Sequence, residues 1–121
     1  MGLFSFLTGN SGGGRRKAAE VHELVESGAV LLDVRENHEW KAGHAPRAIH
    51  IPLGQLPNKL GKLPKDRQIV TTCKVGGRSA RAAAMLRQQG YDVVDLSGGM
   101  LAWQRAGLPV VTDGGGKGRV A

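Results

Sequence analysis

The stretch that decides the fold is QIVTTCKVGGRSARAAAMLRQQ, residues 68–89. Residues 68–73 are rich in β-branched side chains and predict a short strand. Residues 79–89 are rich in helix-forming side chains, begin at a suitable cap residue and stop before Gly90, so they predict a helix. A strand joined to a helix by a short glycine-containing loop is the building unit of an α/β sheet.

The same alternation of short apolar runs and helical patterns continues on both sides of this unit. A helical turn is expected within 55–63, although Pro57 and Gly61 interrupt it. The remaining elements are strands at 29–34, 47–52 and 91–96 and helices at 18–26 and 99–107. This order predicts an α/β fold with a central, mainly parallel sheet and helices on both faces.

The length and the ends of the chain predict one domain with flexible termini. A chain of 121 residues is long enough to bury one apolar core. Residues 15–112 are expected to form the domain, because the glycine-rich segments 1–14 and 113–121 predict flexible ends. The apolar start at 3–7 lacks the features of a signal peptide, and no stretch is apolar enough to span a membrane. We therefore expect no stable membrane association.

The charge balance favours small anionic partners. Lys and Arg number 17 and Asp and Glu 10, which gives a formal net charge of +7. Such a charge suits nucleic acid, an anionic surface or a small anion. Aromatic residues make up only 4% of the chain, too few for a base-stacking platform, so no nucleic acid is expected. The four histidines fit no ligand spacing, and we expect neither a metal nor another cofactor.

The single cysteine, Cys73, falls where the expected strand at 68–73 ends. One cysteine cannot form an internal disulfide, and a free thiol suits the reducing cytoplasm. Gly76 and Gly77 allow the following backbone to curl, so that its N–H groups can point inward as an anion-binding nest. Lys74, Arg78 and the start of the next helix add positive charge, which favours the thiolate. The alternative is a cysteine that only fills the core.

Four motifs, taken in order, resemble the single-domain rhodaneses, a family of sulfurtransferases. The resemblance covers residues 18–111 and implies a rhodanese-like three-layer fold. The motifs are LLDVRENHEW (31–40), GHAPRAIHIP (43–52), CKVGGRSA (73–80) and LSGGMLAWQRAGLPV (96–110).

The resemblance implies a double-displacement reaction with Cys73 as the catalytic nucleophile. The thiolate takes the outer sulfur of a small anionic donor such as thiosulfate and becomes a persulfide. The acceptor is cyanide in vitro and a thiol in the cell, and a protein sulfur donor or acceptor is also compatible with the family. The residues expected to bind the substrate are Lys74, Val75, Gly76, Gly77, Arg78 and Ser79.

Two other functions are weighed against sulfur transfer. Cysteine-dependent phosphatases that share this fold have one residue more between cysteine and arginine than the four found here, so phosphatase or arsenate reductase activity is disfavoured. A non-catalytic rhodanese-like binding or regulatory module is the main alternative. The intact cysteine, glycine pair and Arg78 favour catalysis.

Residues outside the loop are expected to support the site. In the resembling family, the pair matching Asp33 and Arg35 belongs mainly to a hydrogen-bonded scaffold, which favours a supporting role over substrate contact. Glu39 is left out of the site because a negative charge would not help to bind an anion. His44 is expected to fix a loop, and the pair Gly98–Gly99 to allow close approach at the mouth of the site.

Overall fold

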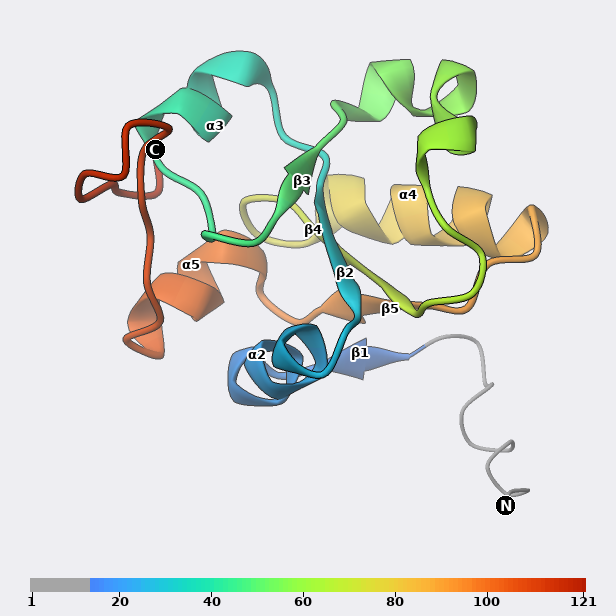
Figure 1. The fold of residues 1–121 in the computed structure, drawn as a ribbon, viewed down its shortest axis with the longest axis horizontal. Coiled ribbons are helices and arrows are strands. Elements are labelled where there is room, and N and C mark those ends of the chain that lie inside the picture. The colour runs from blue at the N-terminus through green and yellow to red at the C-terminus, as the bar shows by residue number, and fades with distance from the viewer. Residues whose placement is uncertain (1–13) are drawn as a thin grey trace.

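Five strands form one sheet in the order β1-β5-β4-β2-β3, in a computed structural model that describes residues 14–121. All neighbouring strands are parallel, which confirms the predicted α/β architecture (Figure 1). The strands are β1 (Arg15–Arg16), β2 (Val30–Asp33), β3 (Ile49–His50), β4 (Ile69–Thr72) and β5 (Val93–Leu96).

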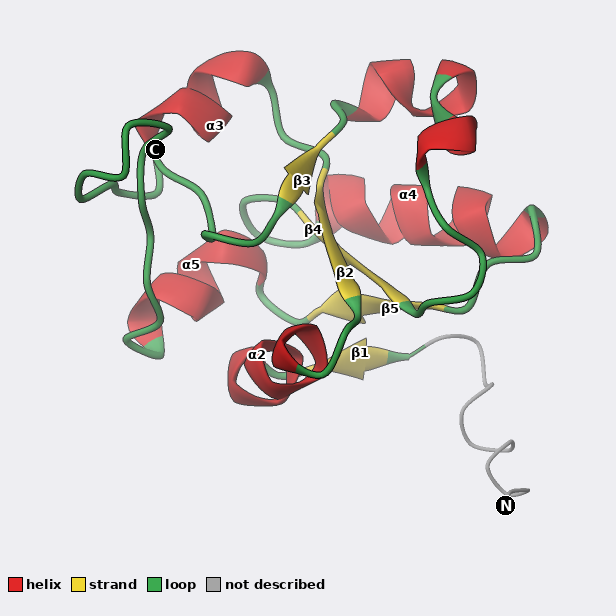
Figure 2. Ribbon diagram, viewed as in Figure 1, coloured by secondary structure: helices red, strands yellow, loops and turns green. Residues whose placement is uncertain are grey.

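Helices cover both faces of this sheet (Figure 2). They are α2 (Ala18–Glu26), α3 (Asn37–Ala42), α4 (Gly77–Gln88) and α5 (Gly99–Arg105), with 3-10 segments η2 (Leu53–Asn58) and η3 (Leu60–Lys62). One cluster of buried side chains joins the sheet to α4 and η2. A second cluster joins the opposite face to α2 and α5. The chain therefore has three layers with two apolar interfaces.

The two central strands β4 and β5 are buried on both faces. Every residue of β4 and of β5 is buried. Successive side chains alternate between the two clusters: Ile69 belongs to the α4 side and Val70 to the α2–α5 side. This double burial is typical of parallel sheets.

Two elements were not expected from the sequence. Helix α3 begins after Glu36, where the side chains of Glu36 and Glu39 each accept a bond from the other residue's backbone N–H in a capping box. Strand β1 lies at the sheet edge, and its register pairs Arg15 with Asp95. Two neighbouring arginines, Arg15 and Arg16, thus contribute a strand to the sheet.

Helix α4 begins earlier than expected and uses Ser79 differently. Gly76 precedes the helix with a φ of 127°, a backbone conformation that favours glycine. Ser79 is the third helical residue and is fully buried. Its side chain contacts Cys73 and does not cap the helix.

The glycine-rich C-terminal segment folds back onto the domain. Val111 forms isolated bridges with His44 and Lys117, and the N–H of Arg119 donates to the carbonyl of Ala42 at 3.0 Å. Val120 packs against the α2–α5 cluster. The expected flexible tail at 113–121 therefore has defined contacts with the loops around α3.

Residues 1–13 lie outside the described part of the chain, and with them almost all of the expected flexible start and the apolar stretch 3–7. Within residues 14–121, no helix has the length and apolar character needed to cross a bilayer.

Candidate active site

Cys73 lies at the carboxyl edge of the sheet, as the sequence predicts. It follows directly after Thr72, the last residue of β4, and the register pairs Thr72 with Asp33 at the end of β2. The carboxyl edge is where α/β sheets place their ligand sites.

Backbone N–H groups point at the sulfur of Cys73. Gly76 donates its N–H to Sγ at 3.1 Å, and Ser79 donates its N–H to Sγ at 3.3 Å. The Ser79 donor is one of the unpaired N–H groups in the first turn of α4, where the helix dipole is positive. The predicted inward-facing nest is confirmed for these donors, and it suits a negatively charged sulfur.

The sulfur is enclosed even though its neighbours suit an anion. Cys73 is 1% exposed and belongs to the apolar cluster on the α4 side. The loop that covers it faces outward: Val75 is 62% exposed, and nothing lies within 4 Å of a side chain built at Gly76 or Gly77. The sulfur is therefore enclosed in this structure, while the outer side of the loop is open.

The start of helix α5 holds the other side of the loop. The N–H of Met100 donates to the carbonyl of Cys73 at 2.7 Å, and that of Leu101 donates to the carbonyl of Lys74 at 3.1 Å. A Cβ on Gly99 would lie 2.5 Å from both of these carbonyl oxygens. The expectation that this glycine pair allows close approach beside the site is confirmed for Gly99.

Arg78 is paired with the carboxylate that sequence reasoning excluded. Its Nη1 and Nη2 donate to the two oxygens of Glu39 at 2.7 and 3.0 Å. The hydrogen bond from Arg78 is the largest cause of lowering the pKa of Glu39 from 4.5 to about 2, against an opposing effect of burial. The same hydrogen bond raises the pKa of Arg78. Arg78 is therefore not a free cation in this structure.

The spacing of Glu36 and Glu39 is a sequence signal that could have indicated a fixed position for the Glu39 side chain. Glu39 stands three residues after Glu36, and the Glu36 N–H donates to Glu39 Oε1 at 2.9 Å. That is the spacing of a capping box, which fixes the side chain at the start of a helix. It positions a carboxylate, but it does not reveal the distant arginine that the carboxylate binds.

Asp33 and Arg35 form a buried ion pair. Both are 0% exposed, and Arg35 Nη2 donates to Asp33 Oδ2 at 2.7 Å and to the carbonyl of Gly43 at 2.8 Å. These contacts tie the end of β2 to the loop after α3. The geometry agrees with the supporting role expected from the resemblance.

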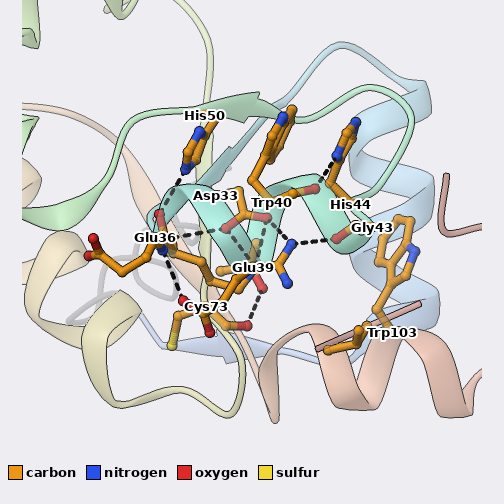
Figure 3. Close-up of polar contacts among 12 residues, drawn as sticks. Asp33, Glu36, Glu39, Trp40, Gly43, His44, His50, Cys73 and Trp103 are labelled. Carbon is orange, nitrogen blue, oxygen red and sulfur yellow. Dashed lines mark hydrogen bonds and ion pairs between the residues drawn. The ribbon is translucent and has the colours of Figure 1, made fainter. Parts of the chain in front are cut away.

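A stack of three rings joins helix α3, the loop after it and strand β3 (Figure 3). The ring centroid of Trp40 lies 3.6 Å from that of His44 and 4.7 Å from that of His50, and both histidine rings are nearly parallel to the Trp40 ring. His44 Nδ1 is 2.8 Å from the carbonyl of Trp40, in agreement with its expected loop-fixing role. Within residues 14–121, no three ligand-type side chains come together as a metal site would require.

Comparisons with known proteins agree on one family. Residues 17–106 match the rhodanese-like domain. A protein named "Sulfurtransferase" from Allochromatium vinosum is 42% identical over 71% of this chain and 81% of its own. A "Putative sulfurtransferase YtwF" from Bacillus subtilis is 42% identical over 71% of this chain and 85% of its own. The crystal structure of a rhodanese-related protein from Thermoplasma volcanium is 35% identical, with a TM-score of 0.77 over 82% of this chain and 98% of that one.

Proposed function

The chain belongs to the rhodanese-like domain family, whose members include proteins named sulfurtransferases, and we propose that it transfers sulfur through a persulfide on Cys73. The observation that carries the proposal is the pair of backbone N–H groups, from Gly76 and Ser79, directed at Sγ. These donors stabilise a negative sulfur in a place from which water is excluded.

The first half-reaction loads the cysteine. The thiolate of Cys73 attacks the outer sulfur of thiosulfate, a new S–S bond forms, and the old S–S bond breaks. Sulfite leaves with the bonding electron pair, and the terminal sulfur of the persulfide carries one negative charge. Total charge is conserved, and no oxidant, reductant or general base is needed once the thiol is ionised.

The second half-reaction unloads it. An acceptor anion, such as cyanide or a thiolate, attacks the terminal sulfur of the persulfide, and the S–S bond breaks toward Sγ. The products are thiocyanate or a new persulfide, together with the Cys73 thiolate. The backbone donors then stabilise the sulfur that receives the charge.

Residues 74–79 are proposed to bind the donor after the loop has shifted. Lys74 follows the nucleophile in the chain, is half-buried and forms no ion pair among the described residues, so it supplies an unpaired positive charge to the loop. Val75 is the exposed residue at the loop tip and would contact a larger donor or acceptor, including a protein. A reducing compartment such as the cytoplasm would keep Cys73 available for this chemistry.

One observation favours the alternative of a non-catalytic binding module: the 1% exposure of Cys73. A buried thiol that never becomes accessible would be structural. The two functions differ in whether the sulfur reacts with a small donor.

Mass spectrometry after incubation with thiosulfate tests the proposal. We expect the intact protein to gain the mass of one sulfur atom, and cyanide to remove it with release of thiocyanate. Cys73→Ser is the matched control and should gain nothing while keeping its fold by circular dichroism. A folded wild-type protein that stays unmodified by thiosulfate, glutathione persulfide and polysulfide would support the binding module.

A further inference from the structure

The C-terminal strap, as we call residues 110–120, connects helices α5 and α3 (Figure 1). Just before the strap, Nε1 of Trp103 on α5 donates to the carbonyl of Pro109 at 2.8 Å. At its far end, the N–H of Val120 donates to Oε1 of Gln104, also on α5, at 3.0 Å. Both ends of the strap are therefore fixed to the same helix. The match to the rhodanese-like domain ends before the strap begins.

Between these two ends, the strap holds the end of α3 and the residues after it. The N–H of Arg119 donates to the carbonyl of Ala42 at 3.0 Å. His44 and Val111 exchange two backbone hydrogen bonds, each of 2.9 Å. A Cβ on Gly43 would lie 2.5 Å from the backbone N and O atoms of Arg119. The strap and the end of α3 are therefore in direct backbone contact.

Helix α3 depends on such contacts for its position. Of its six residues, all within the described part of the chain, only Glu39 is buried. No apolar side chain of α3 thus anchors it in either buried cluster of the described residues. A helix this short is not stable on its own in water. Its place is set by its capping box, by the stacking of Trp40 on His44, and by the strap that binds the backbone of His44.

The same helix acts on the loop that encloses Cys73. Glu39 on α3 binds Arg78 in the first turn of α4 by two hydrogen bonds of 2.7 and 3.0 Å. The next residue, Ser79, donates its N–H to Cys73 Sγ at 3.3 Å. A continuous series of contacts therefore runs from the strap through α3 and the Arg78–Glu39 pair to the enclosed sulfur.

We propose that the C-terminal strap keeps the loop over Cys73 closed, because it holds α3 and the Arg78–Glu39 pair against the first turn of α4. When the strap is released, α3 loses a support, the ion pair weakens and the loop opens more often. The strap thus sets how often a sulfur donor or acceptor meets the sulfur. This inference rests on the proposed function, since opening matters to the reaction only if Cys73 is the nucleophile.

Gly118→Ala tests the role of the strap, with Gly114→Ala as the matched control. A Cβ on Gly118 would lie 2.8 Å from Gly43 Cα and 2.9 Å from the carbonyl carbon and oxygen of Val111, so the strap must move away from α3. At Gly114, in the same strap, nothing lies within 4 Å of the added Cβ. Neither glycine has a φ in the left-handed region, so the two variants differ in this close contact and not in backbone strain.

The readout is the rate of Cys73 alkylation by iodoacetamide. It needs no sulfur donor, and it reports one site because Cys73 is the single cysteine of the chain. We expect G118A to react roughly three- to tenfold faster than the wild type, the change that corresponds to losing about one backbone hydrogen bond from the closed state. G114A should react at the wild-type rate. Equal rates for G118A and the wild type, or equal increases in G118A and G114A, would overturn the inference.

Urea distinguishes local opening of the loop from a general loss of stability. Local opening exposes little surface, so the alkylation rate of G118A should stay nearly constant at urea concentrations below the unfolding transition. A rate that rises with urea in parallel with global unfolding would refute the inference. Hydrogen exchange gives a second readout. The N–H groups of Gly76 and Ser79 should exchange faster in G118A than in the wild type, while those of β5 should not change.

The route through α3 is tested in a Glu39→Gln background. The Arg78–Glu39 ion pair is already lost there, so G118A should add less than half of its original effect on the alkylation rate. An effect of full size would overturn this route.

Gln104→Ala replaces G118A if that variant fails to fold. It removes the acceptor of the Val120 N–H without adding a new contact. We expect Q104A to react roughly twofold faster than the wild type, since one hydrogen bond at the end of the strap is lost. An unchanged rate would overturn the inference.

Persulfide loading by thiosulfate is measured on the same samples by mass spectrometry. A wild-type protein that never loads would refute the proposed function, whatever the alkylation rates are. Normal loading of the wild type, together with an alkylation rate that G118A leaves unchanged, would refute the role of the strap alone.

Discussion

Arg78 and Glu39 join helix α4 to helix α3 by two parallel hydrogen bonds, of 2.7 and 3.0 Å, beside the loop that encloses Cys73. The side chain of Arg78 is 34% exposed and that of Glu39 only 9%. The positive charge of Arg78 is thus already bound by a carboxylate of the same chain. How strongly Arg78 acts on a donor depends on this partner.

Glu39→Gln should strengthen binding of anionic donors. The amide oxygen can still accept from the Glu36 N–H, while Arg78 loses its counter-charge and becomes free to meet thiosulfate. We expect the KM for thiosulfate to fall roughly three- to tenfold with kcat little changed. That change corresponds to about 0.7–1.4 kcal/mol, which is somewhat less than one full hydrogen bond to a charged group contributes. Steady-state kinetics at saturating cyanide measure this. Glu36→Gln removes an exposed charge nearby and is the control. A KM unchanged or raised in E39Q would show that Arg78 does not reach the donor.

Arg78→Ala should destabilise the fold mainly because it leaves the Glu39 carboxylate without its ion-pair partner. A buried carboxylate that loses its cation is costly, and with part of the pair open to solvent we expect a loss of about 1–3 kcal/mol in the free energy of unfolding. In the R78A/E39Q double variant most of the lost stability should be recovered, because no unpaired carboxylate remains at position 39. Urea denaturation of the four proteins gives the coupling. Additive effects would contradict a stabilising interaction between the two side chains.

The pH dependence of stability should report the same pair. The pKa of Glu39 is lowered from 4.5 to about 2, so its ionised form is favoured by folding. Its contribution to stability is complete above about pH 4.5 and is lost as the pH falls toward 2. Over that window the melting temperature of the wild type should fall more steeply than that of E39Q. Parallel curves would mean that the carboxylate gains nothing from Arg78 in the folded state.

Asp33→Ala should reduce the free energy of unfolding more than substitutions in the Arg78–Glu39 pair do. Arg35 is 0% exposed. Without Asp33, its fully buried guanidinium would keep only the hydrogen bond to the Gly43 carbonyl. Breaking such a pair typically costs about 3–5 kcal/mol. Thermal denaturation of D33A checks this, with Asp66→Ala, an exposed aspartate, as the control. A loss no larger than that of the control would contradict the scaffold role.

The fold and the nucleophile could be predicted from the sequence because their signals are local. Strand β4 shows in the sequence as a run of β-branched residues, and Cys73 stands at the end of that run. The role of Glu39 could not be predicted, because its partner Arg78 is distant in sequence and meets it only once α3 and α4 have packed. Helix α3 itself was missed because its six residues carry little periodicity and its start depends on a glutamate capping box. Ser79 looked like a cap from its neighbours alone, whereas tertiary contacts with the sulfur decide its place.

Gly99→Ala should damage both the fold and the site. Gly99 has a φ of 62°, which costs a non-glycine residue roughly 1–2 kcal/mol, and its Cβ would lie 2.5 Å from the carbonyl oxygens of Cys73 and Lys74. The new methyl group must therefore push the loop away from α5 and weaken the Met100 hydrogen bond to Cys73. Gly107→Ala is the matched control, since its φ of 79° carries similar strain but nothing lies within 4 Å of its Cβ.

We expect G107A to lose only the stability that the strained backbone at a positive φ costs, and to form the persulfide at the wild-type rate. G99A should lose more stability in urea denaturation and should load Cys73 at least several-fold more slowly. The difference between the two variants isolates the contact between α5 and the loop, because the backbone strain is common to both. Equal stability and equal loading rates in G99A and G107A would show that the loop does not depend on close approach at Gly99.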